Sequence, residues 1–175
     1  DDYLSWNQIQ VVWDSGSYDY YGRPVEGKLS NINMTVNANE WSHIAVTFGE
    51  KTIKVYVNGV EKGSSTTNVP SSVNFGIAHN DEQGTRITRC FWVGYSYEHA
   101  RYFPGMMSEL RIWNRVLTAD ELANATRRYG VDPKSEGLVT YWKCDEGQGD
   151  VIKDYTSYRN DLASDGLKWE PVSLP

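Results

Sequence analysis

The stretch "NEWSHIAVTFGEKTIKVYVNGVEKGSS", Asn39–Ser65, decides the fold, because it combines two strand patterns with a hairpin turn. Residues 41–48 are mostly apolar on both faces of an extended chain, as in a buried strand, and residues 53–57 alternate with a period of two. Asn58 and Gly59 then supply the two left-handed positions of a type I′ turn. The stretch therefore predicts a hairpin within a β-sheet.

Trp41 and His43 in this stretch raise the question of an active site. They are two residues apart and share one face of the predicted strand. A catalytic histidine needs a nucleophile or an acid within hydrogen-bonding distance, yet Ser42 lies on the opposite face and Glu40 at the strand entrance. We therefore interpret Trp41 as a core residue and His43 as the partner of a buried backbone group.

Strand patterns recur on both sides of the hairpin. The candidate strands are "NQIQVVWD" (7–14), "CFWVGYS" (90–96), "MMSELRIWNR" (106–115), "GLVTYWKC" (137–144) and a closing edge, "LKWEPVSL" (167–174). A polar loop is expected at 79–89 and a turn-dominated segment at 145–166. Many short strands separated by turns predict an all-β fold of the β-sandwich or jelly-roll type.

One helix is predicted, in "LTADELANATRRYG" (117–130). Thr118 occupies an N-cap position and Glu121 follows three residues later, which is a capping box. Arg127 and Arg128 suit the C-terminal end of the helix dipole, and Gly130 can close it. We expect a short helix near residues 119–128.

The composition excludes several functional classes. The 175 residues carry a net charge of −6, and 13% of them are aromatic, with 7 Trp and 12 Tyr. An acidic chain without a Lys/Arg block is unsuited to nucleic acid or to an anionic membrane surface. No apolar run is long enough for a membrane span, so we expect no direct membrane insertion by this segment.

Three segments in series carry a family resemblance: "EWSHIAVTF" with "TIKVYVNGV", "FWVGYS" with "FPGMMSELRIWNRVLTADEL", and "GLVTYWKCDEGQGDVIKDYTSYRNDL". Together they resemble the laminin-G-like (concanavalin A-like) jelly-roll domains of bacterial surface proteins. The last segment is particularly similar to the C-terminal domain of surface lipoproteins of gut-bacterial glycan-utilisation systems. The resemblance implies a concanavalin A-like jelly-roll β-sandwich and an extracellular or cell-surface location, on the bacterial outer surface.

The sequence departs from this family at its beginning. Family members start with strands of the "F-T-[VI]-E-A-W" type, which this chain lacks. We therefore expect residues 1–175 to be a single jelly-roll domain without its first strands, the C-terminal part of a longer parent protein. Cys144 also stands where the family has a bulky core residue, and Ser108 where an Asp is common.

The sequence favours binding over catalysis. Glucanases on this fold carry paired acids as E-x-D-x-x-E or E-x-D-x-E on one strand, and neither motif occurs here. Sugar rings stack on Tyr and Trp, and sugar hydroxyls bond to polar side chains. Two tyrosine-rich loops offer both, and the predicted ligand-binding residues are Tyr18, Tyr20, Tyr21, Arg23, Tyr97 and Arg101.

The predicted function is a non-catalytic, lectin-like carbohydrate-binding domain of a cell-surface protein. Its partners would be an oligo- or polysaccharide and the other domains of the parent chain. The sequence leaves two alternatives open, an accessory domain of a glycoside hydrolase and a structural or protein-adhesion domain.

Calcium is a further candidate ligand, since it prefers carboxylate and carbonyl oxygens. Asp81 and Glu109 are the metal-ligand candidates, and further donors lie at Glu82, Asp145, Glu146 and Asp154. No self-contained calcium loop is present, so such a site would draw on distant segments. The pairing of Cys90 with Cys144 is also left open, with two buried thiols as the favoured interpretation.

Overall fold

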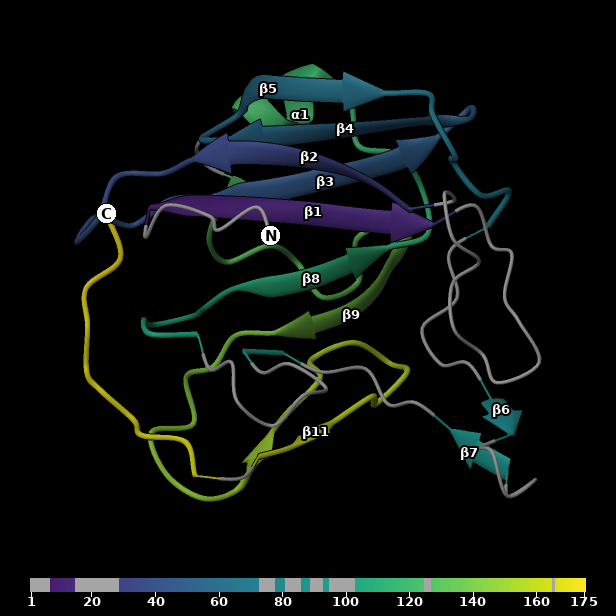
Figure 1. Cartoon of the computed structure of the whole chain (residues 1–175). Coiled ribbons are helices and arrows are strands. Elements are labelled where there is room, and N and C mark those ends of the chain that lie inside the picture. The colour runs from purple at the N-terminus through teal and green to yellow at the C-terminus, as the bar shows by residue number, and fades with distance from the viewer. Residues whose placement is uncertain are drawn as a thin grey trace. The chain divides into compact units, whose positions relative to one another are not determined.

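The computed structural model describes residues 7–14, 29–72, 78–80, 86–88, 93–94, 103–124, 127–164 and 166–175 (Figure 1). Strands dominate these ranges and the helix is short, which confirms the all-β prediction. The elements are β1 (Gln8–Asp14), β2 (Leu29–Thr35), β3 (Ile44–Gly49), β4 (Thr52–Val57), β5 (Val60–Ser65), β6 (Ala78–Asn80), β7 (Arg86–Thr88), β8 (Leu110–Trp113), α1 (Ala119–Ala123), β9 (Leu138–Trp142), β10 (Val151–Ile152) and β11 (Leu162–Ala163).

The chain divides into two compact units. The first comprises residues 1–36, 48–55 and 62–105, and the second comprises residues 37–47, 56–61 and 106–175. Strands β3, β4 and β5 have residues in both and form one three-stranded sheet in that order. The single domain expected over residues 1–175 stays a prediction.

In the first unit, β1 and β2 form an antiparallel pair. Val12 is exposed while its neighbour Trp13 is buried, as the period-two pattern requires. The indole of Trp13 also donates a hydrogen bond to the Thr67 carbonyl, 2.9 Å away. The strand predicted at 7–14 is confirmed, whereas β2 was not predicted.

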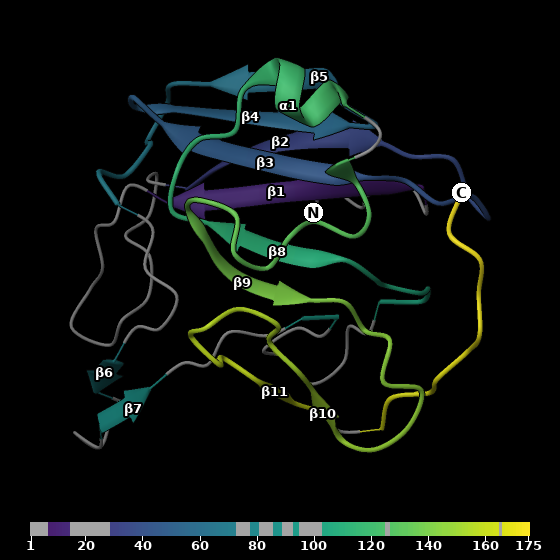
Figure 2. The same ribbon diagram turned by 180° about the vertical axis from the view of Figure 1, so that it is seen from behind.

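The hairpin turn between β4 and β5 is confirmed. Asn58 and Gly59 have φ values of 52° and 80°, the left-handed conformation that a type I′ turn needs. A Cβ atom at Gly59 would lie 2.7 Å from the Cα of Ala123 and from the Leu122 carbonyl oxygen. The turn therefore packs directly against α1, which lies beside it in Figure 2.

Strand β3 begins three residues later than predicted. Trp41 and His43 precede it, and both are half-buried rather than core residues. The strand is also less buried than expected, since Val46 is 48% exposed. The apolar pattern overestimated its burial because exposed apolar side chains are common at protein surfaces.

The capping box at the start of α1 is confirmed. The Glu121 amide donates to the Thr118 hydroxyl at 3.2 Å, and the Thr118 amide donates to the Glu121 carboxylate at 2.9 Å. The helix ends at Ala123, however, so the predicted extent to residue 128 is wrong. Asn124 already has extended backbone angles, with φ −70° and ψ 104°.

Residues 127 and 128 make tertiary bonds instead of continuing the helix. The guanidinium of Arg111 on β8 donates to the carbonyls of Arg127 and Arg128, each at 2.8 Å. Arg127 reaches back to Glu121 at 2.7 Å, and Arg128 donates to the Asn58 carbonyl at 2.8 Å. These bonds tie residues 127 and 128 to β8, to α1 and to the turn between β4 and β5.

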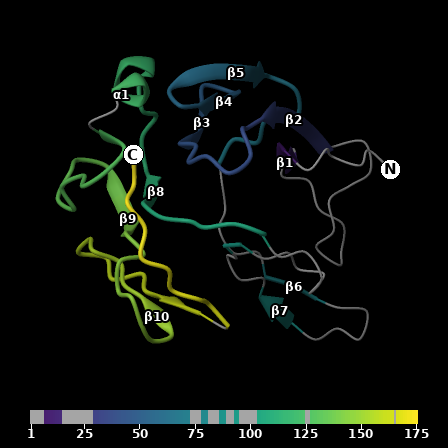
Figure 3. The same ribbon diagram turned by 90° about the vertical axis from the view of Figure 1, so that its left-hand side faces the viewer.

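In the second unit, β8 pairs antiparallel with β9 (Figure 3), and β10 pairs antiparallel with β11 (Figure 2). Ile112 lies opposite Thr140 and Trp113 opposite Leu138, so Val139 is an extra residue in a β-bulge. The short antiparallel pair β6–β7 overlaps the loop expected at 79–89. Residues 167–174 form no strand, so the predicted closing edge is wrong.

Candidate functional site

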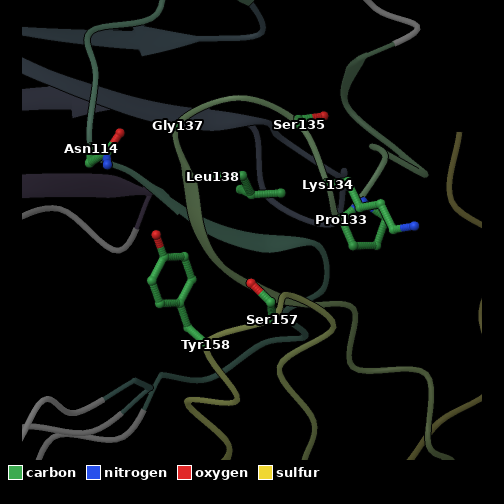
Figure 4. A pocket seen from close by; sticks show the side chains of 8 residues that line it. All are labelled: Asn114, Pro133, Lys134, Ser135, Gly137, Leu138, Ser157 and Tyr158. Carbon is green, nitrogen blue, oxygen red and sulfur yellow. The ribbon is translucent and has the colours of Figure 1, made fainter.

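An open pocket of about 210 Å³ lies in the second unit (Figure 4). Three segments line it: the end of β8, the turn that leads into β9, and a loop that follows β10. Its lining residues are Asn114, Pro133, Lys134, Ser135, Gly137, Leu138, Ser157 and Tyr158.

Backbone hydrogen bonds fix the turn on one side of the pocket. The Asp132 carboxylate accepts the Lys134 amide at 2.9 Å, and the Asp132 carbonyl accepts the Ser135 amide at 2.9 Å. Asp is favoured at such positions because its short side chain can mimic a backbone turn. The Leu138 amide then donates to the Ser135 carbonyl at 3.1 Å, which joins the turn to β9.

Gly137 closes the pocket against the end of β8. Its carbonyl accepts the Asn114 amide at 2.8 Å, and its φ of +79° is a conformation that side chains disfavour. A Cβ atom here would lie 2.9 Å from Cγ of Arg115 and 3.0 Å from the Asn114 side-chain oxygen. Only glycine fits this position without displacing a pocket residue.

Asp154 organises the third segment, residues 154–161. Its side chain is fully buried and accepts the amides of Tyr141, Thr156 and Asn160 at 2.9–3.0 Å, together with the Thr156 hydroxyl at 3.0 Å. Burial alone would raise the pKa of Asp154, but these hydrogen bonds outweigh it and hold the pKa below its ordinary value. The carboxylate therefore stays ionised and bonded at neutral pH.

The β-bulge on β9 provides a second anchor for this loop. The Val139 carbonyl accepts the Thr156 hydroxyl at 3.0 Å, and the same hydroxyl accepts the Tyr158 amide at 3.3 Å. The Asn160 amide group donates to the Thr140 hydroxyl at 3.1 Å. Tyr158 is thus presented by a loop that is bonded on both sides.

The polar side chains of the pocket are available to a ligand. Within the described part of the chain, no hydrogen bond or ion pair engages the side-chain polar groups of Asn114, Lys134, Ser135, Ser157 or Tyr158. The Tyr158 ring is 61% exposed, which leaves it open to stacking. The pocket therefore offers an aromatic surface beside amide, hydroxyl and ammonium groups.

The pocket lining contains no acid–base pair. None of its eight lining residues is an Asp, Glu or His. A hydrolytic site of either stereochemistry would need two carboxyl groups flanking the bond that is cleaved. The lining offers hydrogen-bonding groups and one aromatic ring, and it supplies no carboxylate pair.

His43 is not part of this pocket. Its backbone amide and carbonyl both bond to Asn58, at 2.9 and 2.8 Å, so the main chain of His43 is fixed at the hairpin turn. The ring Nδ1 atom is buried without a hydrogen-bond partner among the described residues, contrary to the expectation that the ring bonds a backbone group. Burial, then the charges of Arg111 and Arg128, lower the pKa of His43 to about 4.

The ligand-binding residues predicted from sequence fall outside the described residues. These are Tyr18, Tyr20, Tyr21, Arg23, Tyr97 and Arg101. Asp81, Glu82 and Cys90 also lie outside them. Their proposed roles in binding and metal coordination stay predictions.

The described metal-ligand candidates bond to protein groups. Glu109 accepts the Tyr141 hydroxyl at 2.6 Å and the Gly130 amide at 3.2 Å. Asp145 accepts the Tyr155 hydroxyl at 2.8 Å, and Glu146 accepts a backbone amide at 2.7 Å. The described ranges contain no group of three or more His, Cys, Asp or Glu side chains suited to a metal ion. Calcium binding stays a prediction.

Cys144, among the described residues, is a free cysteine and is half-buried. Burial, followed by the nearby charges of Glu146, Asp145 and Glu109, raises the pKa of its thiol to about 11. A thiol with such a pKa carries little thiolate at neutral pH and is a poor nucleophile.

The comparison with protein families is decisive for the fold. The profile of the concanavalin A-like lectin/glucanases superfamily, Laminin_G_3, matches residues 3–123. The chain belongs to this superfamily. The concanavalin A-like, laminin-G-like fold predicted from the sequence is thereby confirmed.

Two solved structures resemble this superfamily member. A candidate carbohydrate-binding protein from Bacteroides ovatus ATCC 8483 shares 28% identity at a TM-score of 0.57, over 91% of this chain and 48% of that one. An S-layer domain-containing protein (residues 221–444) from Clostridium thermocellum ATCC 27405 shares 22% identity at a TM-score of 0.34, over 66% of this chain and 50% of that one. The chain spans about half the length of each.

No curated protein matches the sequence. Within the described residues, no helix is both long and apolar enough to cross a membrane.

Sequence reasoning missed the pocket of this concanavalin A-like domain. Its residues come from three separated segments whose meeting depends on the β8–β9 pairing and on the buried Asp154. One signal was present, a tyrosine within the polar turn "DYTSYRND" (154–161). Tyrosine in a polar loop favours an exposed ring with a role in recognition.

Proposed function

We propose that the chain is a non-catalytic, lectin-like carbohydrate-binding domain. The observation that carries the proposal is the pocket, in which the exposed Tyr158 ring lies among four polar side chains that no group in the described part of the chain bonds. The Bacteroides ovatus protein, described as a candidate carbohydrate-binding protein, supports the same class of ligand.

The chemistry of the pocket suits a sugar. The apolar C–H face of a pyranose stacks on an aromatic ring, and its hydroxyls both donate and accept hydrogen bonds. Asn114 offers both an amide donor and a carbonyl acceptor, while Ser135 and Ser157 offer hydroxyls that can rotate to either role. Lys134 adds a flexible ammonium donor at the rim.

The two tyrosine-rich loops remain proposed as ligand-binding segments in their own right. Tyr18, Tyr20, Tyr21, Arg23, Tyr97 and Arg101 carry this part of the proposal. We also propose that the domain works at the bacterial outer surface, within a larger glycan-utilisation protein whose other domains are its partners. A calcium ion held by Asp81 or Glu109 is a further proposal for this surface.

A glycan array followed by titration calorimetry tests the function, first with calcium and then with a chelator. We expect saturable binding that weakens about tenfold in Tyr158→Ala, because loss of one stacked ring is worth roughly 1 kcal/mol or more. Tyr20→Ala and Tyr97→Ala would weaken binding if those loops share the ligand. Loss of binding with the chelator would support a calcium site.

If the folded domain bound none of the host and plant glycans on the array, the carbohydrate-binding proposal would be overturned. It would favour the structural or adhesion role instead. Hydrolysis of a bound glycan by the purified domain would contradict the non-catalytic assignment.

A further inference from the structure

The pocket is small for an extended ligand. Its volume of about 210 Å³ is below the roughly 300–1,000 Å³ of pockets that enclose drug-sized molecules. Of the eight described residues that line it, Tyr158 is the one with an aromatic ring. A glycan chain lying along this site would find one stacking partner, so the lining matches one sugar ring rather than several.

The hydrogen-bonding groups surround the same small volume. Asn114 follows β8, Ser135 belongs to the turn before β9, and Ser157 precedes Tyr158 in the loop (Figure 4). Their polar groups are unbonded within the described chain and approach from different segments. Polar groups from three segments that line one small pocket suit the hydroxyl pattern of one ring.

The site is also fixed before any ligand binds. Asp154 holds its loop by accepting three backbone amides, and the Thr156 hydroxyl adds a fourth bond, with its one proton within reach of both Asp154 and the Val139 carbonyl. On the other side, the close approach of Gly137 to Asn114 sets the position of the β8 end. A preorganised pocket avoids the ordering cost of mobile loops, so a small ligand can bind without induced fit.

We infer that this pocket is a preformed subsite for one terminal sugar unit, which recognises the end of a glycan chain rather than its interior. The inference rests on the proposed carbohydrate-binding function and adds to it a mode of recognition. Ser135, Ser157 and Asn114 read the ring hydroxyls, and Tyr158 covers the apolar face.

Calorimetry across chain length tests this mode. The probes are methyl glycosides of glucose, galactose, mannose and N-acetylglucosamine, and linear tetrasaccharides that end in each of these sugars. We expect the Kd of the best methyl glycoside to lie within fivefold of the Kd of the matching tetrasaccharide. Replacing only the terminal sugar of that tetrasaccharide should weaken binding tenfold or more.

Two exposed tyrosines of one loop provide a test variant and a control. Tyr158→Ala should weaken binding of the methyl glycoside about tenfold. Tyr155→Phe is the control, because Tyr155 lies on the same loop, is 39% exposed, and does not line the pocket. It should leave the Kd unchanged.

The outcomes separate the inference from the function on which it rests. Terminal recognition would be overturned if the tetrasaccharide bound more than fivefold more tightly than the methyl glycoside, or if changing the terminal sugar left the Kd unchanged. Carbohydrate binding itself would still hold in either case. If Tyr158→Ala left sugar binding unchanged, the pocket would not be the sugar-binding site. The tyrosine-rich loops would then remain the candidates. Absence of binding by every probe would refute both.

Discussion

At the scale of single residues, Asp154 determines the geometry of the candidate site. A buried ionised carboxylate is costly unless it is fully hydrogen-bonded, and Asp154 achieves this with four donors from β9 and its own loop. The three backbone donors would be left unsatisfied without it. Asp154 therefore contributes to stability and holds Tyr158 in place.

Asp154→Asn should lower the free energy of unfolding by about 3 kcal/mol, because the amide cannot accept all four bonds and the buried N–H groups lose a charged partner. Urea unfolding measures the change. Asp145→Asn is the matched control, since Asp145 is exposed and accepts one hydroxyl, so its loss should cost less than about 1 kcal/mol. Equal losses in the two variants would refute the role assigned to Asp154.

His43 makes stability depend on pH. Its pKa is about 4 in the folded chain and about 6.5 when unfolded, so between these values the unfolded state binds more protons. Stability should therefore fall as the pH is lowered from about 6.5 to 4. His43→Gln, which does not titrate, should flatten this part of the profile. Urea unfolding at pH 7 and pH 5 tests the prediction. An equal change in the free energy of unfolding between these pH values in the wild-type protein and in His43→Gln would contradict it.

At the scale of elements, the β8–β9 pair carries the site. The bulge at Val139 frees a carbonyl for the loop, and Gly137 brings the two strand ends together. Both features lie where the β8–β9 pairing meets the pocket. Bulges serve such roles elsewhere, re-aiming chains at the edges of sites.

Gly137→Ala should weaken sugar binding and lower stability by about 2–3 kcal/mol, through left-handed strain and a clash with Arg115 and Asn114. Gly149→Ala isolates the strain alone, because Gly149 has a φ of +81° and a Cβ atom there would meet none of the described residues within 4 Å. It should cost about 1 kcal/mol and leave the Kd unchanged. Equal effects of the two changes on binding would show that the crowding at Gly137 does not shape the pocket.

The sequence predicted elements wherever local chemistry determines structure. Asn58 and Gly59 specify the turn, and Thr118 with Glu121 specifies the helix start, because both signals act within four residues. The end of α1 at Ala123 was mispredicted: Arg127 and Arg128, which suit a helix C-terminus, bond instead to Glu121 and Asn58, and Arg111 of β8 binds their carbonyls. Such long-range bonds leave no local pattern.

The candidate site was harder to predict for the same reason. The tyrosine-rich loops were proposed from composition, and they lie outside the described residues. The pocket depends on a bulge at Val139 and on the buried carboxylate of Asp154, and the latter resembles a solvated surface acid in the sequence. Neither feature can be recognised without the pairing of β8 with β9.

At the scale of the whole molecule, the family match and the pocket lead to the same class of ligand. The superfamily contains lectins and glucanases, and the pocket lining supplies groups for binding without a carboxylate pair. Fold alone does not establish function, so the residues around Tyr158 carry the argument. The chain spans about half of the Bacteroides ovatus protein, and the activity of a whole parent protein stays a proposal.

The most direct test of the central claim is an NMR titration of the isotope-labelled chain with the best-binding methyl glycoside. The account predicts saturable amide shifts concentrated at Asn114, Ser135, Gly137, Ser157 and Tyr158. Saturable binding that leaves these five amides unmoved, with shifts confined to other parts of the chain, would contradict it.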